Sequence, residues 1–246
     1  MSAEPPSVGL AYKNAAFLDS DDARPLRILA EYLQPLHAFA REDICDTIVF
    51  FGSARLKEGS VWYEAARQLA FRLTQWSKGL EPSGQRRFLV CTGGGPGIME
   101  AANRGASEAR GRNVGLTISL PREESVNPHV TRELSFHFHY FFMRKFWLAY
   151  MAKAVIVFPG GYGTLDELFE VLTLVQTKRM TKPMPIVLFG DQYWKEVIDF
   201  DALVRHGTIN PEDVNLVYRT DSVDDAYEWL VRLLAKYALE NPGATL

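Results

Sequence analysis

The sequence predicts an α/β fold with one doubly wound parallel sheet and an N-terminal helical extension. Strand-like and helix-like segments alternate from residue 47 onward. The strand-like segments are apolar throughout, which is typical of strands buried on both faces, and three of them end in glycines. Helices then cover both faces of the sheet, and ligands bind at the carboxyl ends of its strands. We assign residues 1–45 to the extension and residues 46–246 to a single domain.

The extension contains one clear helical pattern. Residues 1 to about 20 show no periodicity, so we expect them to be loose or to lie over the surface. A helix is predicted from Asp21 to Ala40, where apolar residues recur at helical spacing. They are Leu26, Leu29, Ala30, Leu33 and Leu36. Pro35 is expected to bend or end this helix, because proline cannot donate the intrahelical hydrogen bond.

The domain then alternates between the two kinds of element. Apolar runs predict strands over 47–55, 88–95, 113–120, 134–140, 154–158, 184–190 and 216–218. Helical patterns lie between them and after them, at 61–76, 96–110, 141–154, 164–178 and 222–239. The polar segment 121–133 is expected to form a solvated loop, and a lid is one role for it.

Composition narrows the range of functions. The chain has 246 residues, of which 47% are hydrophobic and 23% charged, as in ordinary globular proteins. A net charge of -3 gives no electrostatic reason to expect a nucleic acid partner. No apolar stretch is long enough to span a membrane, and the start of the chain does not resemble a secretory signal. With two cysteines only, a disulfide framework is not expected, and we expect a cytoplasmic protein.

The loop after the strand at 154–158 has the composition of an anion site. A glycine loop that runs into a helix exposes backbone N–H groups, and the helix dipole adds positive charge there. Both favour a phosphate. The alternative is that the glycines only shape a tight turn, and one such loop alone does not decide between the two. The loop residues are Gly160, Gly161, Tyr162, Gly163 and Thr164.

Two further glycine loops are predicted at the same edge, and they favour a nucleotide. One contains Gly52 and Ser53, and the other, TGGGPG, contains Gly94. Neither TGGGPG nor the 160–164 loop has the Gly-Lys-Ser/Thr ending of a Walker A loop. The dinucleotide fingerprint also fails, because Glu100 stands where its third glycine belongs. A single phosphate loop indicates one phosphate, as in a nucleoside monophosphate.

Glu167 allows two interpretations. With Thr164 it matches a capping box, in which the threonine is the N-cap and the glutamate is at the third helical position. A carboxylate beside a phosphate is nevertheless repelled by it. A site that also stabilises a cationic sugar would use such a carboxylate, because an oxocarbenium-like transition state forms when a glycosidic bond breaks.

Arg144 and Lys145 interrupt an otherwise apolar helix. Both side chains could reach solvent along their aliphatic stems, and for Lys145 we leave the two readings open. For Arg144 we favour a functional role, because its helix leads into the strand that ends at the 160–164 loop. A guanidinium could bind a phosphate or a base through paired hydrogen bonds.

These residues carry a resemblance. RK, an alanine-rich turn, an apolar strand and PGGYGTxxE together resemble the LONELY GUY family of nucleotide phosphoribohydrolases. TGGGPGIMEAANRGA resembles the other glycine motif of its bacterial members, and the likeness covers about residues 47 to 190. The resemblance implies a modified Rossmann sheet, a homo-oligomer that is a dimer or an assembly of dimers, and no cofactor or metal. It also implies release of the base from nucleoside 5′-monophosphates, such as AMP or cytokinin nucleotides, to leave ribose 5-phosphate.

The resemblance also implies roles for individual residues. Arg144 and Glu167 match the two essential residues of the family, and Lys145 matches a substrate-binding position. Substrate-binding positions are further matched by Ser53, Gly94, Gly160, Gly161, Tyr162, Gly163, Thr164 and Thr173.

The sequence also departs from the pattern of the short plant-type proteins. They carry a different pair of residues where Phe142 and Met143 precede RK. Their sugar-binding acid has no clear match, and Asn127 is the nearest candidate. We therefore expect AMP or a relative rather than a hormone nucleotide. The alternative is a protein that binds a nucleotide or molybdenum cofactor without hydrolysing it, and a test for free adenine separates the two.

Overall fold

The computed structural model describes residues 9–80, 85–119 and 126–244. Within them, seven parallel strands form one sheet in the order β4-β3-β2-β1-β5-β6-β7, which confirms the predicted fold class. The strands are β1 (Thr47–Phe51), β2 (Leu89–Thr92), β3 (Asn113–Ile118), β4 (Ser135–Phe138), β5 (Ala152–Val157), β6 (Ile186–Phe189) and β7 (Tyr218–Thr220).

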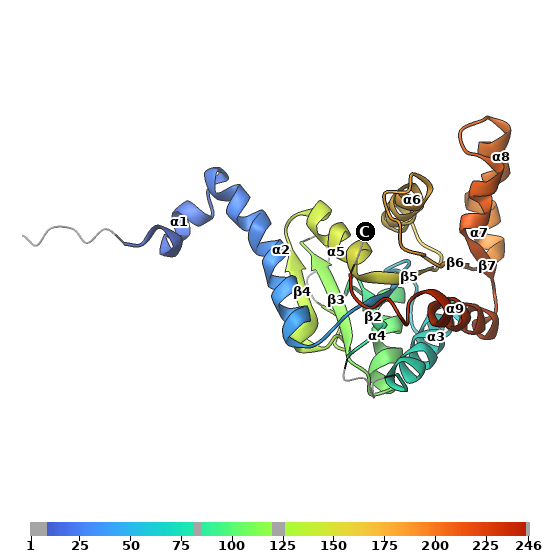
Figure 1. Ribbon diagram of the computed structural model, residues 1–246, viewed down its shortest axis with the longest axis horizontal. Helices are drawn as coiled ribbons and strands as arrows, with labels where there is room; N and C mark the ends of the chain where they lie inside the picture. The colour runs from blue at the N-terminus through green and yellow to red at the C-terminus, as the bar shows by residue number, and fades with distance from the viewer. Residues whose placement is uncertain (1–8, 81–84, 120–125, 245–246) are drawn as a thin grey trace, which may run out of the picture.

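Helices cover both faces of the sheet (Figure 1). Every residue of the five inner strands is therefore buried. The helices of the domain are α3 (Val61–Lys78), α4 (Ile98–Glu108), α5 (Phe141–Met151), α6 (Tyr162–Gln176), α7 (Asp191–Val197), α8 (Phe200–Arg205) and α9 (Val223–Tyr237). One apolar core lies between the sheet and α3, α4 and α9, and a second lies on the opposite face under α5, α6 and α7. Short 3-10 turns are η4 (Arg132–Leu134) and η5 (Pro211–Leu216).

Strand order determines where a ligand can bind. From β1 the chain builds outward through β2 and β3 to β4, and it then returns to the other side of β1 with β5. The direction of winding therefore reverses between β1 and β5. In doubly wound sheets the loops beyond such a reversal diverge and leave a crevice.

The N-terminal extension consists of η1 (Ala11–Lys13), α1 (Ala15–Leu18), η2 (Asp21–Ala23) and α2 (Arg24–Arg41). The C-terminal part of α2 packs beside β4 and α5, whereas its beginning and α1 project away from the domain (Figure 1). Of the segment predicted to be loose, residues 1–8 lie outside the described residues.

Pro35 lies inside α2 and does not end it, which was one of the two outcomes expected for this proline. A proline at this position cannot donate to the carbonyl of Glu31. That carbonyl accepts a hydrogen bond from the indole Nε1 of Trp147 instead, at 3.1 Å. The freed acceptor is thereby satisfied, and the helix continues to Arg41.

The side chain of Glu31 also fixes the start of α5. Its two carboxylate oxygens accept hydrogen bonds from the backbone N–H groups of His139, at 2.7 Å, and Tyr140, at 3.2 Å. A negative charge at a helix N-terminus is favourable, because the first N–H groups lack partners within the helix. The extension thus holds the helix that carries Arg144.

Two expectations fall partly on residues that are not described. The predicted loop 121–133 is described only from residue 126, where turns lead into η4, so its role as a lid lies outside the described residues. Within the described ranges, no helix combines the length and the apolar character that crossing a bilayer requires.

Candidate active site

Three glycine-bearing loops meet at the carboxyl edge of the sheet. The backbone N–H of Ser53, after β1, donates to the carbonyl of Pro159, after β5, at 3.0 Å. The carbonyl of Ser53 accepts from the N–H of Ile98, which follows the second loop, at 3.1 Å. The structure therefore places all three loops together at the crevice between β1 and β5.

The second loop approaches the first too closely for any residue but glycine. Gly97 has a φ of +70°, and a Cβ at this position would lie 2.3 Å from the carbonyl oxygen of Ser53. Gly94 is likewise left-handed and lies against Thr117 of β3. These glycines allow the loops to pack, which is the structural role that the sequence left open for them.

The N-terminus of α6 presents donors without partners. The first backbone hydrogen bond of the helix runs from the N–H of Leu165 to the carbonyl of Gly161. Within the described residues, the N–H groups of Tyr162, Gly163 and Thr164 have no hydrogen-bond acceptor. Because the helix dipole adds positive charge at this end, the loop has the chemistry of an anion site.

Access to these donors differs along the loop. Gly161, Gly163 and Tyr162 are exposed, and the Tyr162 side chain is 93% exposed. Gly160 and Thr164 are buried against each other, since a Cβ on Gly160 would lie 2.1 Å from the Thr164 hydroxyl. That hydroxyl has no hydrogen-bond partner among the residues described, so it remains available to a ligand.

The predicted capping box is wrong. Helix α6 begins at Tyr162, two residues before the expected start, with Gly161 as N-cap and no side-chain cap. Thr164 is therefore the third helical residue, and Glu167 lies a further turn along. Glu167 is free of the capping role that would have explained it structurally.

Glu167 pairs with Arg144 instead. The guanidinium Nη2 of Arg144, on α5, lies 2.9 Å from the Oε1 of Glu167, on α6, and each side chain is 13% exposed. Burial raises the pKa of Glu167 to about 7, and the positive charge of Arg144 opposes that rise. Near neutral pH the carboxyl group can therefore both accept and release a proton.

The bonding of Arg144 is incomplete. Its Nε is buried without a partner among the described residues, and its Nη1 would lie 3.7 Å from a Cβ built on Gly93 of the second loop. A guanidinium has five N–H donors in a planar fork, and in the described part of the chain one hydrogen bond, to Glu167, uses them. Arg144 therefore has N–H donors near the second loop that remain available to a ligand. The exposed ring of Phe141 lies 5.8 Å from the guanidinium of Arg144.

Lys145, on α5, contacts α6, and Thr173 belongs to α6. The Nζ of Lys145 forms ion pairs with Asp166, at 2.9 Å, and Glu170, at 3.1 Å. The hydroxyl of Thr173 donates to the carbonyl of Phe169, at 2.7 Å. These α6 residues line an open groove of about 500 Å³, together with Tyr162, Leu165 and Leu174. Lys145 also lines a small cavity together with Glu167.

A buried network below the second loop was not predicted. The amide of Asn103 joins the Thr92 hydroxyl, at 2.6 Å, to the side chains of Asn113 and Asn127, at 2.9 and 3.0 Å. Asn127 also donates to the carbonyl of Gly95 at 3.0 Å. The side-chain amide of Asn127, which the sequence made the nearest candidate for a sugar contact, is therefore used to hold the second loop. Such a network is indicated in a sequence by polar residues within apolar elements, such as Thr92 and Asn103, because buried polar groups need hydrogen-bond partners.

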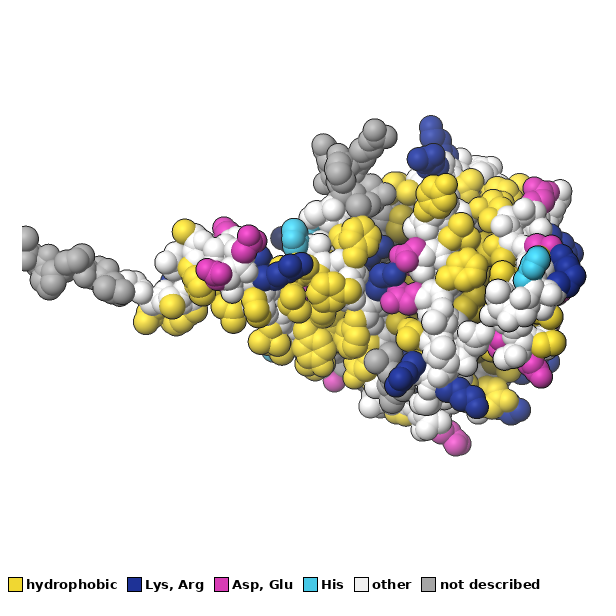
Figure 2. All heavy atoms as spheres, turned by 90° about the horizontal axis from the view of Figure 1, so that it is seen from above, with side chains coloured by type: hydrophobic (Ala, Val, Ile, Leu, Met, Phe, Trp, Pro, Cys, Tyr) yellow, Lys and Arg dark blue, Asp and Glu magenta, His cyan; other side chains and the backbone are white. Residues whose placement is uncertain are grey.

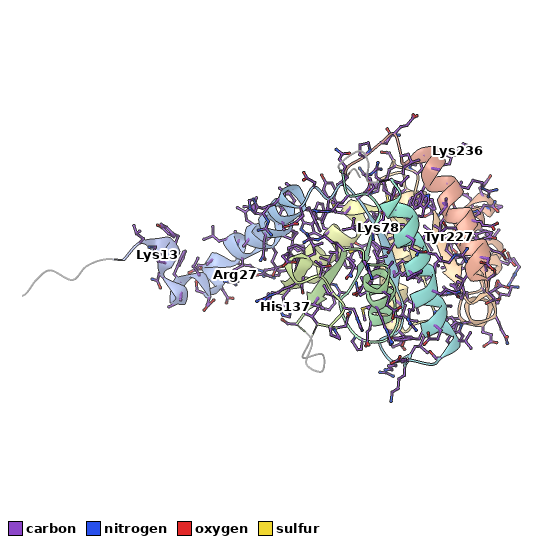
Figure 3. All side chains as sticks on the ribbon, turned by 90° about the horizontal axis from the view of Figure 1, so that it is seen from below. Lys13, Arg27, Lys78, His137, Tyr227 and Lys236 are labelled. Atoms are coloured by element: carbon purple, nitrogen blue, oxygen red, sulfur yellow. The ribbon has the colours of Figure 1, made fainter. Side chains whose placement is uncertain are left out.

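The described ranges hold no group of three or more His, Cys, Asp and Glu residues placed to bind a metal ion. His137, on β4, instead lies between the hydroxyls of Thr117, at 3.0 Å, and Ser119, at 2.8 Å. Figure 3 shows His137 at the sheet and apart from the projecting N-terminal segment.

Comparisons with known proteins show the family of this chain. The profile of the family described as "Possible lysine decarboxylase" matches residues 99–230. The cytokinin riboside 5′-monophosphate phosphoribohydrolase LOG7 of Arabidopsis thaliana is 34% identical over 199 residues, 78% of this chain and 82% of that protein. Its Arabidopsis relative LOG3 is 30% identical over 77% of this chain and 81% of that protein.

Solved structures share the fold at lower identity. An X-ray structure of a structural genomics target is 22% identical, has a TM-score of 0.53 and covers 76% of this chain and 99% of that chain. The molybdenum cofactor carrier protein of Chlamydomonas reinhardtii is 21% identical, with a TM-score of 0.52, and covers 77% of this chain and 99% of that chain. Taken with the family profile and the Arabidopsis relatives, the fold and the loops show that this chain belongs to the LONELY GUY (LOG) family.

Proposed function

We propose that this protein hydrolyses the N-glycosidic bond of nucleoside 5′-monophosphates and releases the free base and ribose 5-phosphate. One observation carries the proposal: among the described residues, the Arg144–Glu167 pair is incompletely bonded, and it lies beside a helix N-terminus whose N–H groups lack partners. Relatives at 34% and 30% identity are named as phosphoribohydrolases of a nucleoside monophosphate, which supports this class of reaction.

The anion-binding end of α6 holds the 5′-phosphate in this proposal. The N–H groups of Tyr162 and Gly163 and the Thr164 hydroxyl donate to its oxygens, as helix N-termini do in many phosphate sites. Glu167 lies one turn further along α6, so a ribose attached to that phosphate can reach it. Ser53, Gly94, Gly160 and Gly161 shape the loops around the nucleotide.

Glu167 and Arg144 divide the chemistry between them. The Glu167 carboxylate accepts a proton from water as the water oxygen attacks C1′, and its charge stabilises the oxocarbenium-like sugar. The C1′–N bond breaks, and its electron pair leaves with the base, which then takes up a proton. Arg144 donates hydrogen bonds to the nucleotide through the guanidinium N–H groups that are not bonded to Glu167. No cofactor or metal takes part in this scheme.

Lys145 and Thr173 are placed to act at the edge of the site. Thr173 lines the groove along α6 together with Tyr162, and Lys145 forms ion pairs with Asp166 and Glu170 of that groove. In the proposal Lys145 and Thr173 contact a substituent of the substrate, or a partner subunit of a homo-oligomer, rather than the reacting sugar. AMP is the substrate we propose first, with cytokinin nucleotides as the second choice, and the cytoplasm is the proposed location.

A product assay across a panel of nucleoside 5′-monophosphates tests the proposal. The panel contains AMP, the other common monophosphates and isopentenyladenosine 5′-monophosphate, and chromatography measures free base and ribose 5-phosphate. We expect equal amounts of the two products from at least one purine nucleotide. Tight binding of a nucleotide without release of base would instead support the non-catalytic binding protein.

A further inference from the structure

Helix α2 is apolar on two faces, and only one of them is covered. The inward face carries Tyr32 and Phe39, whose rings pack against Trp147 at centroid distances of 5.6 Å each. The outward face carries four leucines that remain half exposed. Their exposed fractions are 49% for Leu26, 50% for Leu29, 48% for Leu33 and 40% for Leu36.

The outward leucines form a continuous stripe, which we call the leucine seam. The space-filling view shows apolar side chains gathered along the segment that projects from the domain (Figure 2). Contiguous exposed apolar patches mark interaction surfaces. The seam therefore requires a partner.

The spacing of the seam identifies the partner as another helix. Intervals of three, four and three residues separate Leu26, Leu29, Leu33 and Leu36. This is the a and d pattern of a coiled coil, in which each side chain enters a hole on a facing helix.

We propose that the leucine seam pairs with the seam of a second copy of this chain, with the two α2 helices antiparallel. A two-fold axis level with Glu31 places Leu26 opposite Leu36 of the partner copy, and Leu29 opposite Leu33. Each side then presents the same patch to the other, as a closed two-fold interface requires. All four leucines of each copy are covered.

Charge at the ends of the seam selects the antiparallel arrangement. The exposed Asp21 precedes α2, and the exposed Arg41, whose Nε pairs with Glu42 at 3.2 Å, ends it with further N–H donors facing solvent. The same axis brings Asp21 of one copy beside Arg41 of the other, at both ends of the interface. A parallel pair would instead place Asp21 beside Asp21 and Arg41 beside Arg41, which is unfavourable.

The surface available for burial extends beyond the leucines. Stable interfaces bury about 800 Å² on each partner, more than four leucines supply. Leu10, Tyr12 and Phe17 are also exposed, in the segment before α2. Arg27 ties that segment to α2 by donating to the carbonyls of Leu18 and Ser20, both at 2.6 Å. Figure 3 shows Lys13 and Arg27 on this projecting part, clear of the sheet.

Molar mass in solution tests the pairing. Light scattering coupled to size exclusion is applied to the full chain and to a variant with Leu29→Glu and Leu33→Glu. The matched control changes Val61 and Val197 to glutamate, two exposed apolar residues away from α2. We expect the seam variant to have half the mass of the wild type, and the control to keep the wild-type mass. Equal masses for the wild type and the seam variant would overturn the proposal.

Cysteine cross-linking tests the direction. Mild oxidation of a Leu29→Cys, Leu33→Cys double variant should give a covalent dimer, because residue 29 of one copy faces residue 33 of the other. The Leu29→Cys single variant and the wild type, with Cys45 and Cys91 only, should remain uncross-linked. Efficient dimers from the single variant would show parallel pairing and contradict the arrangement.

Far-UV circular dichroism of each variant shows that it is folded. Because the seam is exposed in one chain, its substitution need not disturb the domain. A lipid surface is the other occupant that an apolar helix face could take. Sedimentation with phosphatidylglycerol vesicles by the wild type alone, with unchanged molar masses, would assign the seam to membranes and overturn the proposal. None of these measurements depends on nucleotide hydrolysis.

Discussion

Two buried arginine–carboxylate pairs lie at opposite edges of the same sheet, and they are bonded very differently. At the amino edge, Arg87 binds Asp46 through Nε and Nη2, both at 2.8 Å. Arg87 also donates to the carbonyls of Ala238 and Leu239, at 2.7 and 3.0 Å. Asp46 accepts a further hydrogen bond from the N–H of Phe88, at 2.7 Å. This pair uses nearly all of its hydrogen-bonding capacity.

The pair at the carboxyl edge is left open. Arg144 and Glu167 share one contact of 2.9 Å, and the buried Nε of Arg144 has no partner in the described ranges. Buried polar groups are normally satisfied, because an unpaired one costs free energy. A saturated pair therefore serves stability, whereas an unsaturated pair beside an anion site points to a ligand. The following predictions test this difference, from the largest effect to the smallest.

Glu167→Gln should lower turnover of a nucleoside monophosphate by about 10²- to 10⁴-fold, the usual contribution of a general base. The amide keeps the shape of the side chain but carries no negative charge. Steady-state release of free base measures the effect, and isothermal calorimetry should show that binding persists. Turnover within about threefold of the wild type would mean that Glu167 is not the base.

Asp46→Asn should affect stability instead. Removal of one partner from a buried ion pair typically costs about 3 to 5 kcal/mol, because the other charge is left uncompensated. Urea unfolding measures this loss, and turnover per folded molecule should be unchanged. If Asp46→Asn reduced turnover as Glu167→Gln does, the two pairs would not differ in function.

The pH dependence of stability should separate the wild type from Glu167→Gln. Burial raises the pKa of Glu167 from 4.5 to about 7 in the folded protein. Between these values the folded chain binds more protons than the unfolded chain, so the free energy of unfolding falls as pH rises from 5 to 7. The contribution is at most about 1.4 kcal/mol per pH unit. Turnover should rise over the same range as the carboxylate forms.

Urea unfolding of both proteins at pH 5, 6 and 7 isolates this contribution. Subtraction of the two curves removes every other titrating group. Parallel curves would show that Glu167 has an ordinary pKa and is solvated in the folded protein.

Two threonine hydroxyls repeat the comparison on a smaller scale. Thr164→Val removes a hydroxyl without a partner in the described residues, so it should raise KM about fivefold, as expected for loss of one hydrogen bond of about 1 kcal/mol. Thr92→Val removes a hydroxyl that bonds to Asn103 and to the N–H of Gly94. It should lower the free energy of unfolding by about 1 to 3 kcal/mol. If the two variants changed KM by the same factor and the free energy of unfolding by the same amount, the two hydroxyls would not differ in role.

The fold was largely predictable, because its signal is local. Apolar runs and glycine punctuation placed all seven strands, with ends shifted by a few residues. The exposed seam was not predictable, since the leucine spacing is the same whichever face of α2 is covered. The continuation of α2 past Pro35 was not predictable, because Trp147, distant in sequence, donates a hydrogen bond to the carbonyl of Glu31.

The site was predictable in part. The sequence proposed functional roles for Arg144 and Glu167, and the structure places their side chains in contact. The start of α6 was misplaced, because glycines at 160, 161 and 163 are compatible with both loop and helix. The network around Asn103 and the hydrogen bonds from Glu31 to the start of α5 join residues that are far apart in the sequence. The periodicity of apolar residues carries no information on such contacts.

A crystal structure of Glu167→Gln with AMP tests the central claim most directly, because this variant should bind the nucleotide without cleaving it. We predict that the 5′-phosphate accepts hydrogen bonds from the N–H groups of Tyr162, Gly163 and Thr164. The amide of residue 167 should face C1′ of the ribose, and Arg144 should donate to the nucleotide. A phosphate bound elsewhere, or a ribose turned away from residue 167, would contradict the account.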